Sequence, residues 1–269
     1  MPNGLVEFWK QCKLGKPPFF HPADEDALWQ KEGKFIETNA VSFESFVKNP
    51  RSGDENSRRL HLSLRPVPYL GNLARAKIFI LLLNPGLAPA DYWAETHSPM
   101  LRKRLENNLT QSFGGIGFPF LMLDPQFYWC PGFKWWEGKL RETIRRIARE
   151  QYNNKYIEAM RDLSRKLACL ELVPYHSSSF RTHALIRDLE SVKMAKKFVE
   201  TILTPRAEAG GCTLIVTRQV EEWGFPRGAK ERGNVFVYRG GETQGASLSP
   251  NSRGGKATLR HYGIIDPAR

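Results

Sequence analysis

The chain has few cysteines and no long apolar run, which argues against zinc-binding, membrane-spanning and secreted classes of protein. Its 269 residues include only four cysteines, and no two of them form a C-x-x-C pair, so their spacing argues against a zinc site. We expect them to be reduced, structural thiols of a cytoplasmic protein. No segment approaches the roughly 20 apolar residues that a membrane span needs. The start, MPNGLVEFWKQCK, also lacks the apolar run of a secretory signal.

Acidic residues are also scarce. The chain carries 40 Lys and Arg against 28 Asp and Glu, a net charge of +12. Such an excess favours a polyanionic partner, either nucleic acid or an anionic membrane, and a merely basic surface is the alternative. Residues 1–65 hold 10 basic and 9 acidic residues, so residues 66–269 hold the remaining +11.

Continuous apolar runs predict the strands of a parallel sheet. Ile78–Leu83 contains only Ile, Phe and Leu, which is typical of a strand buried on both faces. Further runs occur at Leu167–Val173, Cys212–Thr217 and Asn234–Tyr238, with helical patterns between them. This alternation predicts an α/β fold, namely a three-layer α/β/α sandwich around a central, mostly parallel four-stranded sheet.

Apolar residues at helical spacing predict the helices between these strands. Leu101, Leu105 and Leu109 place one helical face on residues 100–109, with three basic residues largely off that face. This basic helix suits either a solvated surface, or a lid or DNA-backbone contact beside the pocket. We expect two helices over residues 138–167, and one long amphipathic helix from Leu185 to near Pro205.

Residues 1–65 form a predicted accessory region before an α/β domain of residues 66–269. Short helical patterns occur around residues 5–9 and between residues 24 and 46, and a turn-rich break covers residues 49–54. Leu60–Tyr69 alternates imperfectly and suggests an additional edge strand. No residue pattern in this region indicates chemistry, and its aromatic residues suit packing.

Asn84-Pro85-Gly86 follows the first buried strand directly. Ligands of parallel α/β sheets bind beyond the carboxyl ends of strands, so Asn84 is a polar side chain at the place where chemistry usually occurs. A plain strand-ending turn is the alternative, because Asn, Pro and Gly are common turn formers.

The stretch LLNPGL, followed by GFPF and then by Pro125, Phe127 and Trp129, resembles the mismatch-specific branch of the uracil-DNA glycosylase superfamily. Two departures stand out: Leu82 replaces the first Gly of the usual G-x-N-P-G-L stretch, and a basic insert lengthens the spacing to GFPF. The segments CLELVPYHSS and SLSPNSRGG occur in the order of that superfamily's later motifs. Some relatives carry an iron–sulfur cluster on four cysteines, but the cysteine spacing here does not match.

The resemblance implies a pocket for a base that has been flipped out of DNA. In it, Phe120, the second Phe of GFPF, would stack the base, with Phe118 and Gly86 beside it. Glycines 114, 115 and 117 would let the backbone approach the base closely. Without the resemblance, both phenylalanines would be assigned to the core.

Glu171 lies in the apolar run LACLELV, where a carboxylate is costly unless it has a partner. The superfamily often has an Asn near this position, which pairs with the edge of uracil. A glutamate instead accepts a hydrogen bond from the amino group of cytosine, so Glu171 points to a cytosine-type base. A structural ion pair with an arginine is the alternative.

The last motif carries the remaining departures from the superfamily. Ser247 stands where the resemblance expects the His or Asn that faces the base, which puts the usual uracil chemistry in doubt. The resemblance also suggests DNA contacts by this loop, through Ser249, Asn251, Arg253 and Lys256, and Ser177, a small hydroxyl that follows a strand, can also bind a phosphate. A helix cap at residues 177–179 and a flexible Gly/Ser loop at residues 246–255 are the alternatives.

These observations predict a monofunctional DNA glycosylase. Asn84 would position a water against the anomeric carbon, Ser247 would lie at the second catalytic position, and Phe120 and Glu171 would hold the base. The favoured substrate is a modified pyrimidine, and a modified cytosine is the main candidate. Since phage DNA carries such bases, a role in antiviral defence is a hypothesis. We expect DNA as partner, a monomer, no membrane, no metal and no cofactor.

Two other functions stay open. One is a uracil or thymine mismatch glycosylase, and the other is a non-catalytic DNA-binding or damage-sensing module, which the missing His favours. An enzyme acting on free nucleotides is a third class, but the +11 charge of residues 66–269 argues against it, since a small substrate needs no extended basic face.

Overall fold

The structure is a computed structural model that describes residues 3–29, 36–37, 39–48, 59–180, 183–226 and 228–264. The chain divides into two compact units, each assembled from separated segments. The first comprises Met1–Tyr69, Leu83–Ser112 and Glu171–Phe198, and the second comprises Leu70–Leu82, Phe113–Leu170 and Val199–Arg269. The predicted domain boundary at residue 65 stays a prediction, and the predicted break at residues 49–54 lies outside the described residues.

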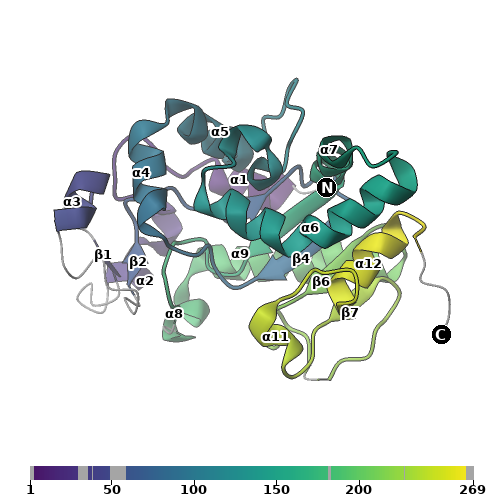
Figure 1. Cartoon of the computed structure of the whole chain (residues 1–269). Helices are drawn as coiled ribbons and strands as arrows, with labels where there is room; N and C mark the ends of the chain where they lie inside the picture. Colours follow the sequence, from purple (N-terminus) through teal and green to yellow (C-terminus); the bar gives the residue numbers. More distant parts are fainter. Residues whose placement is uncertain are drawn as a thin grey trace. The chain divides into compact units, whose positions relative to one another are not determined.

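A mostly parallel sheet forms the centre of the second unit (Figure 1). Its strands are β3 (Tyr69–Leu70), β4 (Ile78–Leu82), β5 (Leu167–Glu171), β6 (Thr213–Val216) and β7 (Val235–Val237). All strand residues except Tyr69 and Glu171, which are counted with the first unit, belong to the second unit. The order is β3-β5-β4-β6-β7, and β6 pairs in parallel with both β4 and β7. Helices flank the sheet, which confirms the predicted α/β sandwich.

The sheet has five strands rather than the predicted four. The additional strand, β3, contains only two residues, which is too short for an alternating pattern to reveal. The run predicted as an edge strand contributes Tyr69 to β3, whereas Leu60 and His61 form β2, which pairs in parallel with β1 (Ile36–Glu37) in a separate sheet. All residues of β4 and β5 are buried, as the apolar character of every residue in them except Glu171 predicts.

The helices of the second unit are α6 (Pro131–Gln151), α7 (Tyr156–Lys166), a π-helical turn (Val199–Leu203), α10 (Thr204–Glu208), α11 (Glu242–Gly245) and α12 (Arg253–His261), with 3-10 turns at Leu121–Leu123 and Pro125–Phe127. The two helices predicted over residues 138–167 are α6 and α7. The α6 side chains Leu140, Ile144 and Ile147 are fully buried, so this stripe faces the core. Helix α12 contacts α6, β6 and β7.

The first unit is mainly helical. Its helices are α1 (Asn3–Trp9), a 3-10 turn (Pro22–Asp24), α2 (Glu25–Trp29), α3 (Phe43–Lys48), α4 (Pro89–His97), α5 (Pro99–Leu109), α8 (His183–Asp188) and α9 (Glu190–Phe198). Helix α5 buries the predicted face of Leu101, Leu105 and Leu109. Arg102, a basic residue of the same helix, donates to the carbonyls of Glu95 and Thr96, so its guanidinium caps the end of α4.

The single long helix predicted from Leu185 is wrong. The chain leaves α8 at Leu189 and starts α9 one residue later. The buried Asp24 explains the break, because its Oδ1 accepts the backbone N–H of Ser191 (2.9 Å) in the first turn of α9. Asp24 lies 167 residues earlier in the chain, so no local pattern shows this cap.

Candidate functional site

Asn84 follows β4 at the end of the buried run, as predicted. Its side-chain nitrogen Nδ2 donates to the Pro85 carbonyl (2.9 Å), to the Ser177 hydroxyl (2.9 Å) and, at 3.4 Å, to the Ser177 carbonyl. Two of these acceptors are backbone carbonyls, which cannot donate, so the amide must present its NH₂ group to them. The amide oxygen Oδ1 consequently points away from these carbonyls and is available as an acceptor.

The segment after β5 holds Asn84 in this orientation. It runs beside the segment after β4, since the Val173 N–H donates to the Leu83 carbonyl (2.8 Å) and the Ser177 N–H to the Pro85 carbonyl (3.4 Å). Ser177 is only 2 % exposed. Its hydroxyl therefore lies within the structure as a partner of Asn84, and its predicted contact with DNA stays a prediction.

His176 ties this segment to Gly86, the predicted base-binding residue. Its Nδ1 lies 2.8 Å from the Gly86 carbonyl and its Nε2 lies 3.2 Å from the Arg65 carbonyl. A neutral imidazole can donate to only one of these two acceptors, whereas the protonated ring donates to both. Burial nevertheless lowers the pKa of His176, against the opposing effects of Glu95 and the two carbonyls.

A buried ion pair supports the same cluster. Arg65 donates to Glu95 through its backbone N–H (3.0 Å) and its guanidinium (2.9 Å), and it also reaches Glu106 (3.1 Å). Burial raises the pKa of Glu95, and the Arg65 charge opposes that rise. The sequence reasoning missed Arg65, Glu95 and His176. The available signal was Arg65 itself, a lone charge in the apolar run LHLSLRPVPYL.

Glu171 is the last residue of β5 and belongs to the first unit. It is 5 % exposed, and its backbone N–H donates to the Pro68 carbonyl (3.0 Å). The structure thus places a buried carboxylate at the end of β5, whereas the sequence predicts a strand that continues to Val173. Its role in reading a base stays a prediction.

Phe118 and Phe120 lie in the second unit. Phe120 is fully buried: its ring meets Trp136 edge-on at 4.8 Å between centroids, and its backbone pairs with the Ser164 hydroxyl. Phe118 is 8 % exposed, with the Arg161 guanidinium 5.2 Å from its ring centre. In this structure, a base can stack on Phe120 only after a neighbouring group has moved.

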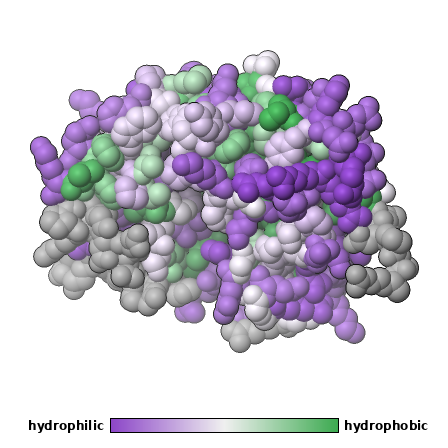
Figure 2. All heavy atoms as spheres, in the orientation of Figure 1, coloured by the Kyte–Doolittle hydropathy of each residue, from purple (hydrophilic) through white to green (hydrophobic). Residues whose placement is uncertain are grey.

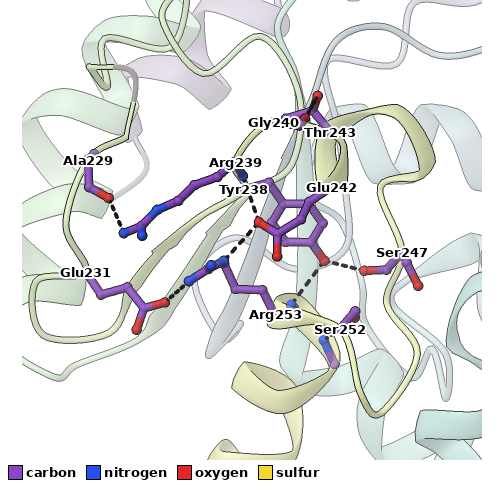
Figure 3. Close-up of polar contacts among 12 residues, drawn as sticks. Ala229, Glu231, Tyr238, Arg239, Gly240, Glu242, Thr243, Ser247, Ser252 and Arg253 are labelled. Atoms are coloured by element: carbon purple, nitrogen blue, oxygen red, sulfur yellow. Dashed lines mark hydrogen bonds and ion pairs between the residues drawn. The ribbon is translucent and has the colours of Figure 1, made fainter.

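The loop of residues 247–252 leads into α12 and is held by Tyr238 (Figure 3). The Tyr238 hydroxyl donates to the Ser247 carbonyl and accepts the Gly254 N–H (3.0 Å). Ser247 and Ser249 pair through their hydroxyls (3.1 Å). A Cβ on Gly254 would lie 2.5 Å from the Tyr238 hydroxyl, so glycine is required for this close approach.

Three of the predicted DNA-contacting residues line one pocket of about 250 Å³ in this region: Asn251, Arg253 and Lys256. Asn251 and Lys256 are exposed, whereas the Arg253 guanidinium is paired with Glu231 and Glu242 (Figure 3). Both carboxylates line the same pocket. A phosphate at Arg253 would therefore have to compete with two existing partners.

The predicted residues thus fall into two groups. The first unit brings together Asn84, Gly86 and Ser177, and also contains Glu171. The second unit contains the two phenylalanines and the loop from Ser247 to Lys256. The polar cluster around Asn84 is the candidate functional site.

No metal centre is evident in the part of the chain that the structure describes, where no three His, Cys, Asp or Glu side chains gather as ligands. None of the four cysteines forms a disulfide, and burial together with Asp24 raises the pKa of Cys12 to about 12. Within the described ranges, no helix has the length and apolar character needed to cross a bilayer. No protein-family model, curated protein or solved structure matches the chain.

Proposed function

We propose that the protein hydrolyses the N-glycosidic bond of a base flipped out of DNA and leaves an abasic site. The orientation of Asn84 carries the proposal. Carbonyl acceptors hold its NH₂ group, so its Oδ1 is free to accept a hydrogen bond from a water. A water held in this way is oriented for attack on the anomeric carbon as positive charge develops on the sugar.

Three further features support this function. The resemblance of LLNPGL and GFPF to the uracil-DNA glycosylase superfamily indicates hydrolysis of an N-glycosidic bond, and the net charge of +12 suits a DNA substrate. The buried Glu171, at the end of β5, suits an amino-bearing base such as a modified cytosine. We expect a monofunctional enzyme, because the resemblance places no nucleophilic lysine.

The test is base release from defined DNA. Duplexes and single strands would contain uracil, mismatched thymine, or plain, hydroxymethylated or glucosylated cytosine, and abasic sites would be scored by alkaline cleavage. We expect one substrate to be cut, and Asn84→Ala to lower the rate by at least about 100-fold, the effect of removing one positioned catalytic group. Asn107→Ala, on α5 in the same unit, is the matched control.

One observation favours a second function, a DNA-binding or damage-sensing module without catalysis. Phe120, the expected stacking residue, is fully buried against Trp136. Tight DNA binding with no abasic sites on any substrate would support this module and refute the enzyme. Release of uracil or thymine alone would keep the enzyme but refute the assignment of Glu171 to a cytosine-type base.

A further inference from the structure

Three arginines form a stripe along the exposed side of α6. Arg141, Arg145 and Arg149 follow one another at four-residue spacing, so they lie on one side of the helix about 6 Å apart along its axis. Their side chains are 49, 61 and 64 % exposed. Figure 2 shows a band of strongly hydrophilic residues where α6 crosses the view in Figure 1.

A hollow of about 500 Å³ lies beside this arginine stripe. Its lining consists of the three arginines with Glu137, Ala148, Asn154 and Tyr156. Tyr156 begins α7, and Asn154 belongs to the turn between α6 and α7, where it adopts a left-handed conformation (φ 63°). The stripe therefore borders a shallow groove with cationic and hydrogen-bonding groups on its walls.

The existing ion pairs of the stripe are of two kinds. Glu137 holds Arg141 through two oxygens (2.9 and 2.6 Å) and also accepts the Tyr156 hydroxyl (2.8 Å). Among the described residues, Arg145 and Arg149 pair with exposed neighbours on their own helix, Glu142 (2.7 Å) and Glu150 (3.1 Å). Exposed pairs of this kind stabilise a protein little, so a phosphate, which a guanidinium can bind through two hydrogen bonds, can replace them.

The chemistry of the groove indicates which polyanion it fits. Helix α6 has six basic and three acidic residues, a balance of +3. An amphipathic helix that lies on a membrane needs an apolar face toward the lipid, but the apolar stripe of α6, including Ile144, is buried in the second unit. A row of exposed guanidiniums without an accessible apolar face fits the phosphates of a nucleic acid.

We propose that the arginine stripe of α6 binds successive phosphates of a nucleic-acid backbone, as a contact surface separate from the cluster around Asn84. The proposal rests on the proposed function only in taking DNA as the partner. Glu137 and Tyr156 fix Arg141 at one end of the groove, and Arg145 and Arg149 exchange their carboxylates for phosphates.

The test is the salt dependence of DNA binding. The double variant Arg145→Gln/Arg149→Gln keeps the Arg141–Glu137 contact and removes two phosphate contacts. Binding to a fluorescent duplex would be followed by anisotropy over a range of salt concentrations. The slope of log K against log salt is negative, and each lost contact makes it less steep by about 0.9, so we expect its magnitude to fall by about 1.8. The matched control is Lys193→Gln/Lys197→Gln on α9, which removes the same charge.

The outcomes separate this inference from the proposed function. A decrease in the magnitude of the slope that is clearly larger for the stripe variant than for the control supports the surface, even if no substrate loses a base. Equal slopes in the two variants would overturn it, because the effect would then be one of net charge alone. Binding to anionic lipid vesicles that the stripe variant abolishes, with DNA binding unchanged, would also overturn it. Base release by Asn84 is scored separately, so failure of catalysis leaves this test intact.

Discussion

His61 makes a specific prediction about the pH dependence of stability. Its side chain is buried, with Nδ1 3.0 Å from the Tyr92 hydroxyl and Nε2 without a hydrogen-bond partner among the described residues. Burial, with smaller effects of the His176 and Arg59 charges, lowers the pKa of His61 from 6.5 to about 4. The folded protein therefore holds this ring in its neutral form.

The sign of the effect follows from proton binding. Between pH 6.5 and about 4, the unfolded chain carries more protons on His61 than the folded protein does. The free energy of unfolding consequently falls as the pH is lowered through this window, and the stabilisation is fully present above it. At about 1.4 kcal/mol per pKa unit, the loss due to His61 amounts to roughly 3 kcal/mol.

The variant His61→Asn keeps a polar atom near Tyr92 but cannot titrate. Free energies of unfolding from denaturant titrations at about pH 7 and about pH 4 would measure the effect. The wild-type protein should lose roughly 3 kcal/mol more than His61→Asn over this interval. His97→Asn, which removes an exposed histidine, should behave like the wild type. An equal loss in His61→Asn and wild type would refute the assignment of a neutral, buried His61.

Three further substitutions test the second unit. Gly255→Ala would place a Cβ 1.8 Å from the Ser249 carbonyl oxygen. It should therefore lower the free energy of unfolding by about 3 kcal/mol, measured by denaturant titration, and lower the affinity for DNA. An unchanged melting temperature would contradict the tight packing of this loop. Phe120→Ala should cost about 3 to 5 kcal/mol, because the ring is fully buried, and a cost below about 1 kcal/mol would mean that the ring is accessible, as base stacking requires. Tyr238→Phe should cost about 1 to 3 kcal/mol, since a buried N–H of α12 loses its acceptor, and a neutral result would contradict the role of this hydroxyl.

The sheet was predictable because its strands are buried on both faces. Full burial requires apolar residues at every position, so β4 and β5 stand out as runs without regular polar interruption. The position of Asn84 follows from the same pattern, since it is the first polar residue after β4. Burial of Phe120 also suits the alternative that assigned it to the core.

Features that depend on distant residues could not be predicted. The start of α9 is set by Asp24, which also accepts the Tyr175 hydroxyl (2.5 Å), and nothing near residue 190 indicates this cap. The pairing of Arg65 with Glu95 joins residues 30 positions apart. Local propensity is a weak prior for such features, because tertiary contacts override it.

Ser177 holds the Asn84 amide in one orientation at the candidate site. Its place after a strand predicts a contact with DNA, which stays a prediction, and the structure shows that its buried hydroxyl accepts a hydrogen bond from the Asn84 amide. The orientation of Asn84 therefore depends on the register of two chain segments, which the hydrogen bond from the Ser177 N–H to the Pro85 carbonyl fixes. Within the Asn-Pro-Gly turn, the Pro85 carbonyl is one acceptor for the amide, and Ser177 supplies two more from the segment after β5. Because two carbonyls accept from its NH₂ group, this turn presents a preorganised acceptor, and preorganised polar groups are what a hydrolytic site requires.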